Sequence, residues 1–165
     1  MGINSIVPRI RFEKTIMLRR LRAMQLAHPQ AFKEAAKKGA IQFLNWCNNG
    51  SMKESRKPPI RWGVLRGSSS AFVGNDLVVI YDQVIKPGAP DEPSPAETYS
   101  GKDMVLTWAW NVDYATKMHE TKYKGGEFTI QDGNAGNKWV EKHLKADKDD
   151  LIAVIGIEFK KRVGM

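Results

Sequence analysis

One stretch near the middle of the chain changes its hydrophobic period, and this change constrains the fold more than any other feature. From Val105 to Trp110 the residues are mostly β-branched, small or aromatic types that suit a strand. From Val112 the apolar positions, Ala115 and Met118 among them, lie three or four residues apart, which is helical spacing. A strand that runs directly into a helix must place that helix across the end of its own sheet. The stretch is therefore predicted to have a structural role and to leave one edge exposed.

Two helices are predicted before this stretch. The first runs from Glu13 to His28, where Pro29 disfavours helix in the preceding residue but suits the first turn of a new helix. The second ends at Asn48-Asn49-Gly50. Its apolar face contains many small residues, which permit close packing against a sheet. This face consists of Phe32, Ala35, Ala36, Gly39, Ala40, Phe43, Leu44 and Cys47.

Strands are predicted at residues 70–73 and 77–82. Gly74-Asn75-Asp76 between them indicates either a hairpin turn or a bulge within one long strand. Residues 60–68 before them are expected to form a turn or a single helical turn. Residues 86–103 contain four prolines and no periodic pattern, so they are predicted to be a long surface loop. Loops of this length are usually functional or disordered, and in an assembly protein they often become ordered only on a neighbour.

The last part of the chain is predicted to be mainly helical. A short strand is expected at residues 128–130, followed by a helical stripe that begins at Trp139. Asp147 is a candidate cap for a separate final helix, although residues 151–159 are also rich enough in β-branched types for a strand. The predicted order is α-α-β-β-β-α-α in one domain, residues 1–165, with an extended arm at 1–12. This order is typical of an α+β fold in which N-terminal and C-terminal helices pack on a mainly antiparallel sheet.

Charge is distributed unevenly along the chain. Residues 1–57 hold 12 Lys and Arg against 3 Asp and Glu, whereas the remaining residues hold 14 against 15. The excess of positive charge therefore lies in the first third, where it indicates a basic face for nucleic acid, for an acidic protein or simply for water. No apolar run approaches the roughly 20 residues that a membrane span requires, so a soluble protein of the cytosol is expected.

The residues that could carry catalysis or bind a metal are scattered. His28, His119 and His143 show no metal-ligand spacing, and the single cysteine, Cys47, has no partner for a disulfide or a metal. Gly101-Lys102 lacks the flanking residues of a phosphate-binding loop. The sequence therefore predicts no catalytic residue, cofactor or metal, and we expect a protein without enzymatic activity.

Aromatic and basic residues together leave two interpretations open. Tryptophans beside an arginine-rich helix can stack on bases and hold a phosphate backbone, as in single-strand binders. Tryptophans in a small α+β domain also serve as core residues or as interface anchors. Trp108 and Trp110 have the same parity on a strand, so they share one face and form either core or a contact patch. The tryptophans concerned are Trp62, Trp108, Trp110 and Trp139, and the predicted basic face consists of Arg19, Arg20, Arg22, Lys33 and Lys37.

Four short motifs resemble a known family. They are WGVLRGS at residues 62–68, VDYA at 112–115, MHE at 118–120 and KWVEKHL at 138–144. In this order, after two helices and before a terminal helix, they are similar to the tail-completion or minor tail-component family of tailed bacteriophages. The chain departs from that family in its extended arm, in its proline-rich loop and in Thr121-Lys122, where the family has Gly-Thr.

The resemblance implies a structural virion protein at the junction of head and tail, a tail-completion, tail-terminator or neck component that is made in the host cytoplasm. It implies a homo-oligomeric ring, a hexamer, between the head connector and the tail tube, with the genome passing nearby. Such a ring needs two different surfaces on each subunit. The side chains expected at the subunit interface, or alternatively in the core of the chain itself, are Trp62, Leu65, Arg66, Trp108, Trp110, Tyr114 and Met118. The competing interpretation is a nucleic-acid-binding protein that uses the basic N-terminal helices.

Overall fold

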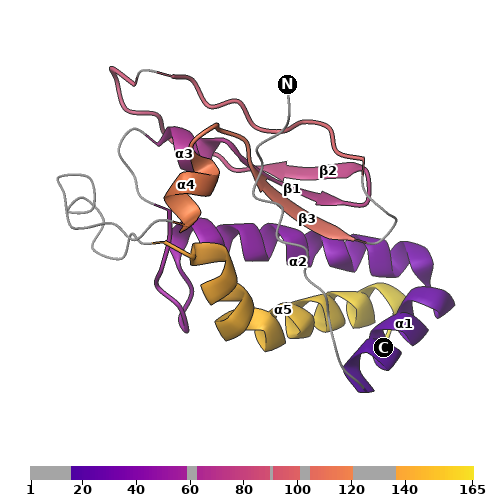
Figure 1. Cartoon of the computed structure of the whole chain (residues 1–165). Helices are drawn as coiled ribbons and strands as arrows, with labels where there is room; N and C mark the ends of the chain where they lie inside the picture. Colours follow the sequence, from indigo (N-terminus) through magenta and orange to yellow (C-terminus); the bar gives the residue numbers. More distant parts are fainter. Residues whose placement is uncertain (1–15, 59–62, 90, 101–104, 121–136) are drawn as a thin grey trace.

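The computed structural model describes residues 16–58, 63–89, 91–100, 105–120 and 137–165. Over these ranges the fold is α+β, as predicted, with helices packed against a three-stranded antiparallel sheet (Figure 1). The helices are α1 (Ile16–Ala27), α2 (Pro29–Asn49), α3 (Val64–Gly67), α4 (Ala115–Glu120) and α5 (Trp139–Val163), and the strands are β1 (Ser69–Val73), β2 (Asp76–Ile80) and β3 (Leu106–Trp110).

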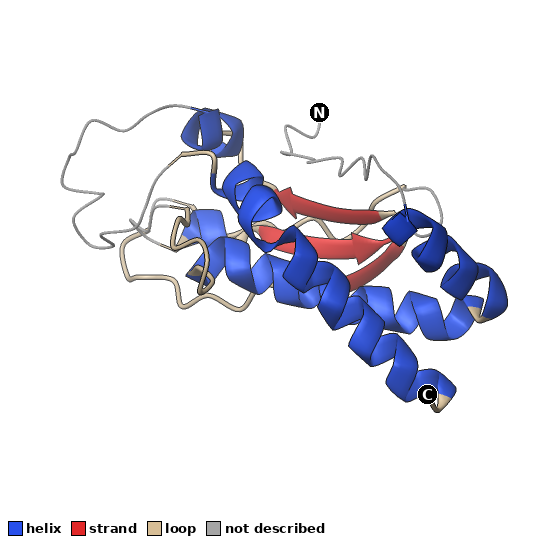
Figure 2. Cartoon of the chain, turned by 90° about the horizontal axis from the view of Figure 1, so that it is seen from below, coloured by secondary structure: helices blue, strands red, loops and turns tan. Residues whose placement is uncertain are grey.

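Helix α2 lies along one face of the sheet, and α5 packs along α2 (Figure 2). Proline stands in the first turn of α2, where its missing N–H costs no hydrogen bond. The helix ends at Gly50, which has a φ of 85° and whose N–H donates to the carbonyl of Trp46. The predicted small-residue face is buried and allows a close approach to α5. At Gly39 an added Cβ would lie 2.5 Å from Cγ1 of Ile155.

The sheet has the strand order β2-β1-β3, so β1 is its central strand. Of the two alternatives for residues 74–76, the hairpin is confirmed, because β1 pairs antiparallel with β2 from Ser70 opposite Ile80 to Val73 opposite Asp76. The register shifts between Ala71 and Phe72 within this pair. Strand β3 is regular against β1.

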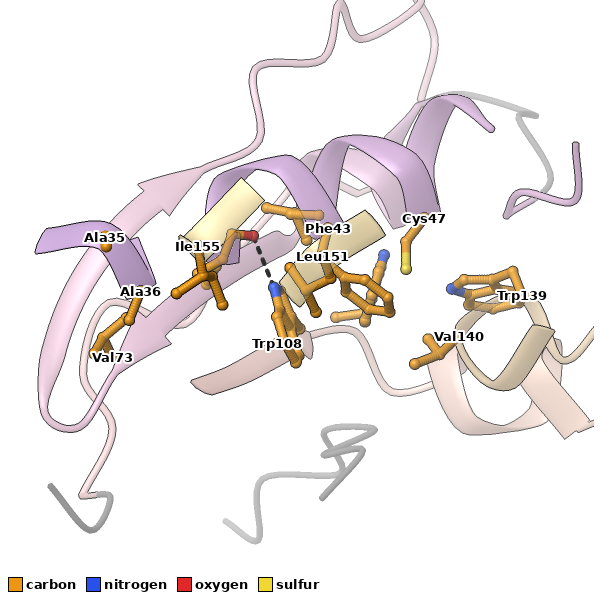
Figure 3. Packing of buried hydrophobic residues seen from close by; sticks show 14 of the residues in the cluster. Ala35, Ala36, Phe43, Cys47, Val73, Trp108, Trp139, Val140, Leu151 and Ile155 are labelled. Carbon is orange, nitrogen blue, oxygen red and sulfur yellow. Dashed lines mark hydrogen bonds between the residues drawn. The ribbon is translucent and has the colours of Figure 1, made fainter. Parts of the chain in front are cut away.

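The two tryptophans of β3 face the helices. Trp108 is in register with Ala71, and its ring centroid lies 4.5 Å from that of Phe43 on α2 (Figure 3). The indole Nε1 of Trp108 donates to the carbonyl of Ala40 at 2.8 Å. Both tryptophans are fully buried, so of the two predicted alternatives, core or contact patch, the core is observed. Fully burying an apolar side chain of this size stabilises the fold by about 2–3 kcal/mol.

The proline-rich segment covers part of the opposite face of the sheet, whereas Leu77 and Ile80 of β2 stay exposed. As predicted, the described residues of 86–103 contain no helix or strand, but they pack on this chain instead of projecting from it. The ring of Tyr99 lies 5.7 Å from that of Phe72 on β1. The side-chain amide of Asn111 donates to the carbonyl of Ser94 at 2.8 Å. Consequently, every residue of β1 is buried.

The C-terminal part differs from the sequence prediction. Helix α5 continues without interruption for 25 residues, so the separate final helix with Asp147 as its cap was a wrong prediction, as was the alternative strand. Asp147 lies in the middle of the helix and is fully buried. Four predicted features fall outside the described residues: the arm at 1–12, Trp62, the end of the loop at 101–103 and the strand at 128–130.

Two glycines of helices provide a matched test of the α2–α5 contact. Gly156→Ala should stabilise the protein by about 1 kcal/mol, because alanine is the better helix former and an added Cβ meets nothing within 4 Å. Gly39→Ala should instead destabilise it by about 1–3 kcal/mol, because the added Cβ would lie 2.5 Å from Cγ1 of the buried Ile155, whose side chain must then shift within the core. Urea denaturation of both variants measures the difference. Equal stabilisation by both substitutions would contradict the close packing of the helices.

Candidate functional site

The segments that carry the family resemblance converge on one end of the molecule. Helix α3, helix α4 and the first turns of α5 lie together there, whereas α1 and the C-terminus lie at the other end (Figure 1). The backbone N–H of Asn111 donates to the carbonyl of Ser68, which joins the start of the α4 segment to the end of α3. The N–H of Lys138 donates to the carbonyl of His119 at 2.7 Å, which joins α4 to α5. We call this end the α4 end.

Most of the described side chains predicted for an interface are buried in this chain. Leu65, Trp108 and Trp110 belong to its hydrophobic core. Arg66 is also buried, and its guanidinium donates two hydrogen bonds to the carbonyl of Pro58, at 3.0 Å from Nε and 2.7 Å from Nη2. Of the two alternatives, subunit interface or core of the chain itself, the structure shows the core for these four residues. Their side chains therefore offer no surface to a neighbour.

Among the described residues that were predicted for the interface, Tyr114 is the most exposed. Its side chain stands at the entry to α4 and is 38 % exposed. Partial burial raises the pKa of the Tyr114 phenol, and the nearby charge of Asp91 raises it further. Met118 packs against the core from the same helix. Among the described members of this set, Tyr114 is therefore the one most accessible to a neighbouring molecule.

The predicted basic face divides into two parts. Arg19, Arg20 and Arg22 on α1 are exposed, and no ion pair involves them within the part of the chain that the structure describes. The two lysines of the predicted face lie on α2 and form ion pairs: Lys33 pairs with Asp76 at 2.9 Å, and Lys37 pairs with Glu34 at 2.8 Å.

At the α4 end, His119, Glu120, Lys138 and Glu141 form a cluster of polar contacts that the sequence did not predict. We call it the His119 cluster. His119 contacts Glu120 through Nδ1 at 2.8 Å and Glu141 through Nε2 at 3.3 Å. The ammonium of Lys138 contacts the second oxygen of both carboxylates. Hydrogen bonds from Lys138 first, and from His119 second, lower the pKa of Glu120. Among the described residues, His119, Glu120 and Glu141 form the one group of three that could hold a metal ion.

A second polar network is buried between α5 and the loop after α2. Asp147 accepts from the hydroxyl of Ser51 at 2.7 Å and contacts Nδ1 of His143 at 2.6 Å, while Nε2 of His143 contacts the carbonyl of Arg56 at 2.6 Å. His143 and Asp147 are four residues apart and lie one above the other on the helix. The i, i+4 spacing is the sequence signal that could have revealed this pair.

This network does not have the geometry of a hydrolytic triad. In such a triad the histidine bonds to the nucleophilic hydroxyl, whereas here Ser51 bonds to the aspartate and both ring nitrogens of His143 have other partners. The thiol of Cys47 is equally unsuited as a nucleophile, because burial raises its pKa well above the ordinary value and the charge of Asp147 adds to this effect. We infer a structural role for the network.

Comparisons of the chain with protein-family profiles, curated proteins and solved structures found no match. Within the described ranges, no helix is both long enough and apolar enough to cross a membrane.

Asp147→Asn tests the buried network. The substitution removes the charge that faces His143 and should destabilise the protein by about 3–5 kcal/mol, as expected when one partner of a buried pair is lost. Asp150→Asn is the matched control, because Asp150 lies on the same helix but forms an exposed pair with Lys53 and should change stability little. Urea denaturation measures both, and an equally small effect of the two substitutions would rule out a structural role for Asp147.

Proposed function

We propose that this chain is a structural protein of a tailed-phage virion, a tail-completion, tail-terminator or neck component that forms a homo-oligomeric ring, a hexamer, at the head-to-tail junction. Its partners in this role are further copies of itself, the connector or neck proteins on one side and the tail-tube protein on the other. The observation that carries the proposal is the order of the four motifs that resemble the family, together with their convergence at the α4 end.

The distribution of exposed apolar side chains supports a ring of this kind. A ring is built from heterologous contacts, in which one surface of each subunit meets a different surface of the next. Tyr114 is exposed at the α4 end. At the opposite end, Leu26 is 83 % exposed and Met165 is 75 % exposed. The two ends of one molecule therefore offer two different apolar surfaces, as head-to-tail assembly requires.

The purified chain should sediment as a closed oligomer, and negative-stain images should show rings. Tyr114→Asp should weaken this assembly without unfolding the chain, because it places a charge on an exposed contact surface. Leu77→Asp is the control, since Leu77 is 40 % exposed but lies on the edge strand β2, beside the turn at residues 74–76. A chain that stays monomeric at every concentration, and that immunogold labelling does not find in the phage that encodes it, would refute the proposal.

The three exposed arginines of α1 favour nucleic-acid binding as a second candidate function. Simultaneous reversal of Arg19, Arg20 and Arg22 to Glu should then abolish binding of a single-stranded oligonucleotide, and affinity should fall steeply as salt rises. The control is the equal charge change at Lys142, Lys145 and Lys148, which are exposed on α5. Fluorescence anisotropy measures both variants, and equal affinities for the two would exclude a specific role of α1.

A further inference from the structure

The ring of His119 is held between two carboxylates at the α4 end. The ring is 3 % exposed and lies edge-to-face against the indole of Trp139, with 4.7 Å between the centroids. Its Nδ1 lies 2.8 Å from Oε1 of Glu120, which is hydrogen-bonding distance. Glu120 therefore orients the ring and favours the tautomer that carries its proton on Nδ1.

This tautomer leaves a lone pair on the other ring nitrogen. Nε2 is shielded from solvent and makes no hydrogen bond. It points towards Oε2 of Glu141 at 3.3 Å, close enough for an ion pair but not aligned for a hydrogen bond. Two acceptors that face each other at this distance repel, and a cation between them converts the repulsion into attraction.

The distance between the two acceptors fits a shared metal ion. Zinc binds histidine nitrogen at about 2.0–2.1 Å and carboxylate oxygen at about 2.0–2.2 Å, and tetrahedral angles then place the two ligand atoms about 3.3–3.5 Å apart. The observed separation of Nε2 and Oε2 is 3.3 Å. A carboxylate on the second nitrogen of a ligating histidine, as Glu120 provides here, is the usual companion of such a site.

The charges of the cluster also suit a divalent cation. Glu120 and Glu141 contribute two negative charges and Lys138 one positive charge, so the cluster with a neutral ring carries a net charge of −1. The ammonium of Lys138 holds Oε2 of Glu120 and Oε1 of Glu141, and it leaves free the oxygen of Glu141 that faces His119. The side chain of Glu141 is half exposed, which gives an ion access from solvent.

We propose that the α4 end binds one Zn²⁺ through Nε2 of His119 and a carboxylate oxygen of Glu141. Glu120 is a positioning residue that fixes the tautomer of His119, and water fills the remaining coordination positions. Imidazole together with carboxylate favours a borderline divalent metal such as zinc. The ion ties α4 to α5. This site is independent of the proposed virion function, because it depends only on the local geometry of the four side chains.

Calorimetric titration of the full chain with zinc chloride near neutral pH tests the site. We expect one ion per chain and an affinity at least tenfold weaker for Glu141→Gln, which keeps the shape of a half-exposed side chain and so preserves the fold. Asp150→Asn removes an exposed carboxylate elsewhere on α5 and should leave the affinity unchanged. Absence of stoichiometric binding, or equal affinities of the wild type and Glu141→Gln, would overturn the proposal.

Nitrogen chemical shifts of the histidine rings provide the second measurement. The chain has three histidines, and zinc should move the Nε2 resonance of His119 while those of His28 and His143 stay in place. If the ring of His119 instead carries two protons and donates to both carboxylates, it has no lone pair for the ion. In that case zinc leaves the resonance unchanged, and the cluster is only a polar link between α4 and α5.

Discussion

Two hydrogen bonds from indole nitrogens fix the position of the sheet on its main helix, and the rest of the structure depends on them. Trp108 donates to the carbonyl of Ala40, and Trp110 donates to the side-chain oxygen of Asn48 at 3.2 Å. The amide nitrogen of Asn48 donates in turn to the hydroxyl of Ser69 on the central strand. The two indole rings bury a large apolar surface. Their N–H groups determine which turn of α2 each ring contacts, because an indole N–H without a hydrogen-bond partner in the core costs free energy. Helix α5 then packs on the surface that α2 and the tryptophans form.

One face of the sheet packs on helices, and the proline-rich segment packs against the other face at Phe72. Exposed apolar side chains remain on the edge strand β2, at Leu77 and Ile80. The features on which the proposed ring and the proposed ion site depend lie at the two ends. The α4 end combines the phenol of Tyr114 with the His119 cluster, whereas the opposite end combines the arginines of α1 with exposed apolar side chains. The architecture thus separates the part of the sequence that holds the fold from the parts available for binding.

The sequence predicted those elements whose signals are local. The change of period near residue 110, the small-residue face of α2 and the hairpin at residues 74–76 each depend on neighbours in the chain, and each is observed. Asp147 was mispredicted because an aspartate suits a helix start by local preference, whereas a buried partner four residues earlier holds it inside a helix. The His119 cluster was missed because Glu141 comes from the far side of residues 121–136, and their proximity arises only from the tertiary fold. For the same reason, spacing alone could not show that Trp108 and Trp110 belong to the core.

The uninterrupted course of α5 has a mechanical consequence. Its 25 residues span about 38 Å at the helical rise, and the helix reaches from the α4 end to the end where α1 and the C-terminus lie. A single hydrogen-bonded rod transmits displacement along its axis with little loss, whereas two helices joined at Asp147 would bend at the joint. The two ends are therefore held at a constant separation, so a partner that binds one end also fixes the position of the other.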